Sequence, residues 1–132
     1  MRDPNNPCLF CNINSQDLVF DNKFAFVSFD SYPVSKYHSL IVPKRHILDY
    51  FELNNDELLA CNDLIKKIKK KIQNEDKTVD GFNIGTNSGV AAGQSIMHCH
   101  IHLIPRRKGD VDNPQGGVRG VIPSKQHYIR KK

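Results

Sequence analysis

Apolar and polar side chains alternate without a break from residue 97 to residue 103. A period of two predicts a β-strand, because successive side chains of a strand point to opposite faces of the sheet. The polar positions are held by three histidines, His98, His100 and His102. We therefore expect their imidazoles on one face, with neighbouring rings about 6–7 Å apart, and the apolar residues between them in the core.

Further strands are expected in the first third of the chain. Residues 18–20 and 24–29 have the alternation of a hairpin with a polar turn between its strands. Residues 39–42 form a short apolar run that Pro43 closes, because proline has no N–H to offer a neighbouring strand.

A long helix is predicted over residues 55–73, and a short one over residues 47–51. Asn54 is a suitable N-cap for the long helix, with Glu57 three residues further on as its capping partner. The expected core-facing stripe of this helix consists of Leu58, Cys61, Ile65, Ile68 and Ile72.

Length and composition fit one soluble domain. We expect it to span 1–132, with its core in about 8–106 and a loop-rich C-terminal segment in 107–132. No apolar run has the length of a membrane helix and residues 1–7 do not form a signal peptide, so a reducing, cytoplasmic location is expected. The net charge of +5 suits an anionic substrate.

Three aligned imidazoles allow two kinds of chemistry. They can hold a metal ion, or one ring can act as a nucleophile while its neighbours donate protons and stabilise charge. The preceding loop, residues 88–95, is rich in small residues whose backbone N–H groups can line an anion site. This loop favours the nucleophile, with Gly93, Gln94 and Ser95 as the expected phosphate contacts.

The segment 98–104 fits, at every position, the signature of the histidine triad superfamily, in which three histidines alternate with apolar residues and a further apolar residue follows. Residues 38–46, 81–87 and 91–95 also resemble this family, so the similarity extends over about 8–106. The resemblance implies an α+β fold with a five-stranded, mostly antiparallel sheet and one long and one short helix. It also implies that two copies join their sheets in a homodimer.

The resemblance assigns roles to single residues. His100 is the expected nucleophile, His102 stabilises charge or protonates the leaving group beside it, and His38 lies behind them and fixes a ring. Asp30 is expected at the ribose hydroxyls, although an Asp before a turn is equally typical of turn initiation. The full set of expected nucleotide contacts is Phe10, Asp30, Asn87, Gly93, Gln94 and Ser95.

Cys8 and Cys11 form a Cys-x-x-Cys pair, which is typical of a redox couple or of half a zinc site. The pair does not open a helix after a strand, which argues against the redox couple, and two cysteines in a plain turn remain an alternative. Bacterial-type members of the family that this chain resembles pair the motif with the positions of His46 and His98. This implies a closed, structural Cys₂His₂ zinc site, in which His98 has a positioning role.

The expected reaction is hydrolysis at the α-phosphate of a nucleotide through a nucleotidyl intermediate on His100, without a catalytic metal. Sugar-phosphate transferases and phosphorylases of this family typically carry Gln in place of the third histidine. Because His102 is present here, we rank these activities below the hydrolases. Dinucleoside polyphosphates such as diadenosine tetraphosphate are the first expected substrates, and phosphoramidates of the AMP–lysine type the second. The resemblance implies that the C-terminal segment lines the active site of the partner subunit, so Arg106, Arg107 or Arg119 is expected to contact the phosphates of the leaving group, with no choice among the three.

Two other classes of function stay open at this stage. A non-catalytic nucleotide-binding or scaffolding protein would bind AMP without turnover. Alternatively, the three histidines together would hold a catalytic metal, and a chelator would then abolish activity but leave the fold intact. We expect neither a membrane nor a specific nucleic acid as partner.

Overall fold

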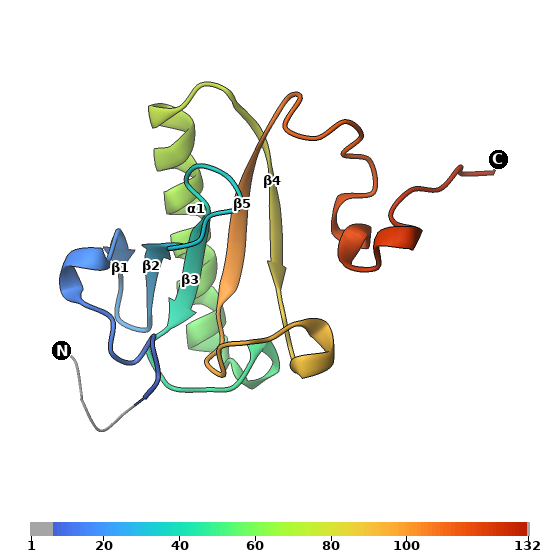
Figure 1. Cartoon of the computed structure of the whole chain (residues 1–132). Coiled ribbons are helices and arrows are strands. Elements are labelled where there is room, and N and C mark those ends of the chain that lie inside the picture. Colours follow the sequence, from blue (N-terminus) through green and yellow to red (C-terminus); the bar gives the residue numbers. More distant parts are fainter. Residues whose placement is uncertain (1–6, 132) are drawn as a thin grey trace.

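The computed structural model describes residues 7–131. Five strands form one sheet in the order β1-β2-β3-β5-β4, and all four pairs of neighbours are antiparallel. The strands are β1 (Phe20–Asp21), β2 (Ala25–Phe29), β3 (Ser39–Pro43), β4 (Val79–Thr86) and β5 (Ile101–Arg107). The predicted α+β fold with a five-stranded antiparallel sheet is confirmed (Figure 1).

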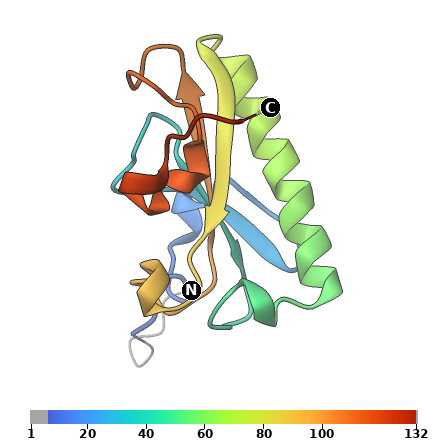
Figure 2. The ribbon, with the colours of Figure 1, turned by 90° about the vertical axis from the view of Figure 1, so that its right-hand side faces the viewer.

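One face of the sheet is covered by the helix α1 (Asn55–Glu75), as Figure 2 shows. Every second side chain of the central strands points towards this helix and is buried against it. The main residues of this core are Ala25, Val27, Ile41, Ile101 and Leu103 from the sheet and Cys61, Leu64, Ile68 and Ile72 from the helix.

The predicted cap of α1 is present, but its first predicted core position is wrong. Asn54 accepts a hydrogen bond from the Glu57 N–H at 2.9 Å, and the Glu57 carboxylate accepts one from the Asn54 N–H at 3.0 Å. Leu58 is 40% exposed, whereas Glu57 is 2% exposed. The buried face passes through Glu57 because its carboxylate is paired with the Arg45 guanidinium at 2.8 Å.

The other face of the sheet is covered by the N-terminal segment, which brings Phe10 onto Phe26, Leu40 and Val42. The short helix predicted at 47–51 is a single 3-10 turn, Tyr50–Glu52. The remaining 3-10 turns are Ser15–Asp17, Val90–Ala92, Gly117–Val121 and Pro123–Lys125.

The strand predicted from residue 97 begins only at Ile101. Ile101 pairs with Ile41 of β3, but further along that strand stands Pro43, which has no N–H for the ladder. The Cys99 N–H instead donates to the Ile47 carbonyl at 2.8 Å, outside the sheet. His98 and His100 therefore lie directly before the strand, and His102 lies within it.

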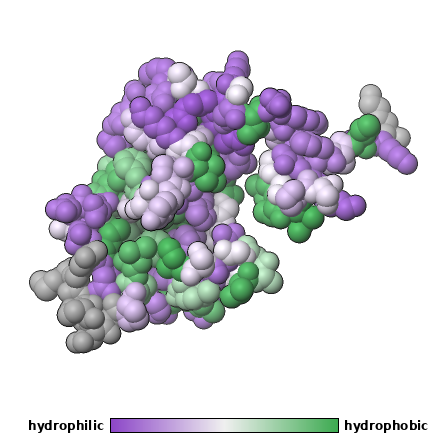
Figure 3. Space-filling view, viewed as in Figure 1, coloured by the Kyte–Doolittle hydropathy of each residue, from purple (hydrophilic) through white to green (hydrophobic). Residues whose placement is uncertain are grey.

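The segment after β5 extends away from the sheet beyond β4 (Figure 1). Apolar side chains gather on its lower side in Figure 3. Within the segment, Val118, Val121 and Ile122 are each more than half exposed. Among residues 7–131 no helix has the length and apolar character needed to cross a membrane.

Candidate functional site

The imidazoles of His100 and His102 lie beside each other, with ring centroids 5.2 Å apart. The His100 backbone is fixed by Thr86 at the end of β4, whose hydroxyl donates to the His100 carbonyl at 2.7 Å. His98 is completely buried and His100 is 8% exposed. The His100 ring is therefore largely shielded from solvent, whereas His102 beside it is only partly buried.

A hydrogen bond to a carbonyl fixes the tautomer of His100. Its Nδ1 lies 2.8 Å from the carbonyl oxygen of His98. Because a carbonyl oxygen only accepts, Nδ1 carries the proton of the neutral ring and Nε2 keeps its lone pair. This is the tautomer that a nucleophilic imidazole needs.

A chain of hydrogen bonds with a fixed direction leads to His102. The Val34 N–H donates to Nδ1 of His38 at 3.0 Å, so the proton of the neutral His38 ring is on Nε2. That Nε2–H donates to Nδ1 of His102 at 2.9 Å. His102 therefore carries its own proton on Nε2, where it can donate to a phosphoryl oxygen.

Burial keeps both rings of this chain neutral. Desolvation lowers the pKa of His38, and the carboxylate of Asp30, 3.5 Å from His38 Nε2, opposes this only in part. Desolvation, with the neighbouring rings of His100 and His38, lowers the pKa of His102 to about 4. Neutral rings preserve the direction of the chain at pH 7.

Asp30, His38 and His102 form a group that can in principle hold a metal, since their ligand atoms lie within 4.8 Å of one another. The hydrogen bond from Val34 argues against this, because it places the His38 proton on the nitrogen that would face the ion. Among residues 7–131 the other such group contains His98, so the three histidines 98, 100 and 102 do not form one metal site.

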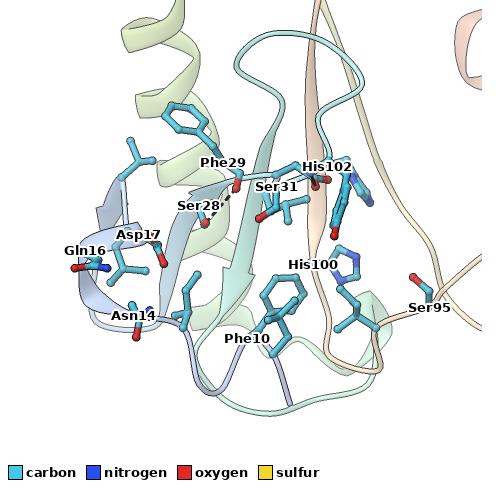
Figure 4. A pocket seen from close by; sticks show the side chains of 18 of the residues that line it. Phe10, Asn14, Gln16, Asp17, Ser28, Phe29, Ser31, Ser95, His100 and His102 are labelled. Carbon is cyan, nitrogen blue, oxygen red and sulfur yellow. Dashed lines mark hydrogen bonds between the residues drawn. The ribbon is translucent and has the colours of Figure 1, made fainter. Parts of the chain in front are cut away.

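A cavity of about 920 Å³ opens beside His100 and His102 (Figure 4). Of the expected nucleotide contacts, Phe10, Asp30, Asn87 and Ser95 line this cavity. Among the described residues, its lining includes two acidic side chains, from Asp17 and Asp30, and neither Lys nor Arg. A phosphate in this cavity would thus contact imidazole, amide and hydroxyl groups rather than the charged side chains of Lys or Arg.

Gln94 differs from its expected role as a donor to phosphate. Its side chain accepts from the Gly89 N–H at 2.9 Å and donates to the carbonyls of Leu48 at 2.7 Å and Ile96 at 3.1 Å. Gly93 has φ of +94°, a left-handed conformation that suits glycine, and ends the 3-10 turn before Gln94. Neither residue lines the cavity, so Gln94 orders the loop and Ser95 is the residue of the three that faces the site.

The three candidate arginines make other contacts. Arg106 forms a two-point ion pair with Asp110, both distances being 2.8 Å. Arg107 lies 3.0 Å from Asp76. Arg119 donates to the Lys125 carbonyl at 2.8 Å. In the described chain none of the three lines the cavity.

Cys8, Cys11, His46 and His98 come together as a second metal-competent group. Nδ1 of His98 lies 3.4 Å from the Cys8 sulfur and 3.6 Å from the Cys11 sulfur. Nδ1 of His46 lies 3.2 Å from the Cys11 sulfur and 3.1 Å from His98 Nδ1.

These distances fit zinc. A tetrahedral ion with bonds of about 2.3 Å to sulfur and about 2.0 Å to nitrogen separates S and N ligand atoms by roughly 3.5 Å and two nitrogens by roughly 3.3 Å. His98 Nε2 lies 2.8 Å from the Pro43 carbonyl oxygen, which leaves Nδ1 without a proton and turned towards the group. A closed set of two thiolates and two imidazoles is typical of structural zinc.

Sequence reasoning missed two contributors to the site. Val34 acts through its backbone N–H, which no side-chain pattern reveals. Thr86 stands at the end of a stretch that the family resemblance covers, but its hydroxyl contact depends on the pairing of β4 with β5.

Two neighbouring histidines on a five-stranded sheet, beside a cavity and a group of two cysteines and two histidines, match the α+β class that the family resemblance implies. Residues 12–109 match the HIT domain family, and the chain belongs to this family. An uncharacterized HIT-like protein of Methanocaldococcus jannaschii is 39% identical over 108 residues, covering 78% of this chain and 81% of that protein.

Solved structures agree with this membership. A hypothetical histidine triad nucleotide-binding protein from Sulfolobus tokodaii has a TM-score of 0.71 and 36% identity, covering 78% of this chain and 71% of that one. A zinc-bound histidine triad family protein from Mycobacterium smegmatis has a TM-score of 0.70 and 30% identity, covering 79% and 78%.

Two curated relatives have named activities. An adenylylsulfatase of Arabidopsis thaliana is 34% identical, over 80% of this chain and 55% of its own length. An adenosine 5′-monophosphoramidase of Saccharomyces cerevisiae is 28% identical, over 76% of this chain and 63% of its own length.

Proposed function

We propose that this protein hydrolyses nucleotides at the α-phosphate through a covalent nucleotidyl intermediate on His100. The observation that carries the proposal is the hydrogen bond from His100 Nδ1 to the His98 carbonyl. It leaves the Nε2 lone pair of a cavity-lining ring available for attack on phosphorus.

In the first step, His100 Nε2 forms a bond to the α-phosphorus and the bond from phosphorus to the leaving group breaks. His102 Nε2–H donates to a phosphoryl oxygen and stabilises the charge that develops there. Because the pKa of His102 is lowered to about 4, it acts at pH 7 as a neutral hydrogen-bond donor rather than as an acid. The leaving group takes its proton from solvent.

In the second step, water attacks phosphorus and releases a proton to solvent, and the bond from phosphorus to Nε2 breaks. His100 keeps its Nδ1 proton, which donates a hydrogen bond to the His98 carbonyl. The modified ring is therefore an imidazolium and a good leaving group. The products are a nucleoside monophosphate and the neutral His100 ring.

We propose nucleoside phosphoramidates, or other substrates with one phosphate and a small leaving group, as the preferred class. The described lining of the cavity has no cationic side chain, and the three candidate arginines are engaged elsewhere. Both features oppose the expected dinucleoside polyphosphates, whose extra phosphates bring extra negative charge. The named activity of the yeast relative supports the same choice.

The test is release of AMP from an AMP–lysine phosphoramidate and from diadenosine tetraphosphate by the zinc-loaded protein. We expect faster turnover of the phosphoramidate and loss of both activities in His100→Ala. His127→Ala is the matched control, because His127 is an exposed histidine in the C-terminal segment. Mass spectrometry after an alkaline quench should find the nucleotidyl group on the peptide that contains His100.

Faster turnover of diadenosine tetraphosphate would overturn the proposed substrate class but keep the mechanism. Full activity of His100→Ala would overturn the mechanism. AMP binding without turnover of either substrate would instead indicate a nucleotide-binding protein that is not a hydrolase.

Zinc held by Cys8, Cys11, His46 and His98 would cross-link the N-terminal segment to the sheet. We also propose that two chains associate through β4, which has a neighbour on one side only in the described chain and carries Ile84 at 51% exposure. Light scattering coupled to size exclusion tests this: a mass of one chain would contradict it.

A further inference from the structure

Phe10 belongs to two sites at once. It stands in the turn between Cys8 and Cys11, and its side chain, 5% exposed, lines the cavity proposed for the nucleotide. Its ring lies 5.7 Å from the His98 ring and 5.0 Å from the His100 ring, measured between centroids. It therefore touches one residue of the metal-competent group and the proposed nucleophile.

His98 forms a second link between the same two sites. Its Nδ1 faces the two cysteine sulfurs, while its backbone carbonyl accepts the hydrogen bond that fixes the tautomer of His100. Any shift of His98 that follows loss of its ligand partners thus alters the geometry of the nucleophile.

The turn that carries Phe10 is not held in place by the hydrogen bonds of a strand or a helix. Residues 8–11 belong to no strand or helix. The Cys8 sulfur accepts a hydrogen bond within the turn, from the Cys11 N–H at 3.4 Å. The cysteine sulfurs also lie against His46 and His98, which are far away in the sequence. A metal ion at this point would fix the turn to the sheet and with it the wall of the cavity.

We infer that binding of zinc to Cys8, Cys11, His46 and His98 and binding of nucleotide to the cavity are energetically coupled, with Phe10 as the positioning residue between them. The inference rests on the proposed function in taking the cavity as the nucleotide site. Coupling between two sites is reciprocal. AMP must therefore raise the affinity for zinc by the same factor by which zinc raises the affinity for AMP.

The experiment measures this coupling without any turnover. Zinc-loaded protein is equilibrated with a chromophoric chelator, with and without saturating AMP, and AMP affinity is measured by calorimetry on the zinc-loaded protein. We expect AMP to lower the apparent dissociation constant of zinc about tenfold, within the usual range of such couplings.

Phe10→Leu is the decisive variant. This variant should still bind zinc and AMP. The factor by which AMP lowers the apparent dissociation constant of zinc should, however, fall to about one. Phe29→Leu is the matched control: Phe29 also lines the cavity, yet its ring packs on Tyr37 at 5.7 Å and lies well apart from Phe10 in Figure 4. This control should keep the full factor even where its AMP affinity is weaker.

The outcomes separate this inference from the proposed function. Failure of the zinc-loaded protein to bind AMP would overturn both. AMP binding with unchanged zinc affinity would overturn the coupling alone. A factor that persists in Phe10→Leu would also overturn it, because the two sites would then be linked only through global folding.

Discussion

The Nε2 atom of His38 lies 2.9 Å from the Nδ1 atom of His102, and His38 is 2% exposed. Water therefore does not compete for this hydrogen bond. The Val34 N–H donates to the other nitrogen of His38. This one backbone group therefore determines which nitrogen carries the proton in both His38 and His102.

Replacement of His38 by Ala should lower kcat about 100-fold, with a much smaller change in KM. Without its donor, Nδ1 of His102 can take the proton itself, and the Nε2 donor to phosphoryl oxygen is lost; removal of one such donor typically costs about 10² to 10³ in kcat. Steady-state kinetics on the phosphoramidate measure this. A changed KM with unchanged kcat would contradict a role in the transition state.

Stability should fall as the pH is lowered from about 6.5 towards 4. The pKa of His102 is lowered from 6.5 to about 4, so in this window the unfolded chain binds a proton that the folded protein excludes. The contribution is fully present above pH 6.5 and is lost on the way down, by about 3 kcal/mol. Urea unfolding of zinc-loaded wild type and His102→Gln should give a steeper pH dependence for wild type; equal slopes would contradict the assignment.

Glu57→Gln should destabilise the fold by about 1–2 kcal/mol, less than loss of a fully buried pair because Arg45 is partly exposed. The paired guanidinium lowers the pKa of Glu57, so its contribution is present above the ordinary pKa of 4.5 and disappears as the pH falls through the lower folded value. Glu75→Gln removes an exposed pair with Lys71 and should change the stability far less, because solvent screens this pair. Denaturant melts at pH 7 and pH 3 compare the two, and an equal effect at both pH values would count against the ion pair.

The four thiols should react in two classes. Burial raises the pKa of Cys61 to about 11 and that of Cys99 to about 12, so neither reacts at pH 8 until the protein unfolds. A chromogenic thiol reagent should find no fast thiol in the zinc-loaded protein, two after addition of a chelator, and four in guanidinium. Two fast thiols before chelation would argue against zinc at Cys8 and Cys11.

Features that depend on local periodicity were predictable from the sequence. The strand alternation around His102 and the cap at Asn54 follow from rules that act over a few residues. The joining of Cys8 with His46 and His98 followed only from the family resemblance, since residues so far apart in the chain carry no local signal of proximity.

Other features depend on tertiary contacts and could not be predicted. Leu58 lost its core position because Arg45, twelve residues earlier than Glu57, pairs with that carboxylate. Gln94 turned away from the cavity because three backbone groups of its own loop and of the 47–51 region satisfy its amide. Side-chain type showed that these residues form hydrogen bonds, but not with which partner.

The backbone from His98 to His102 carries the proposed metal ligand, the proposed nucleophile and the proposed phosphate donor at intervals of two residues, with core residues in between. Deletion or insertion of a single residue in this segment would exchange the two faces of everything beyond it, placing imidazoles under α1 and apolar side chains in the cavity. The segment can therefore vary in the identity of its apolar residues, but its length is constrained by all of its functions together.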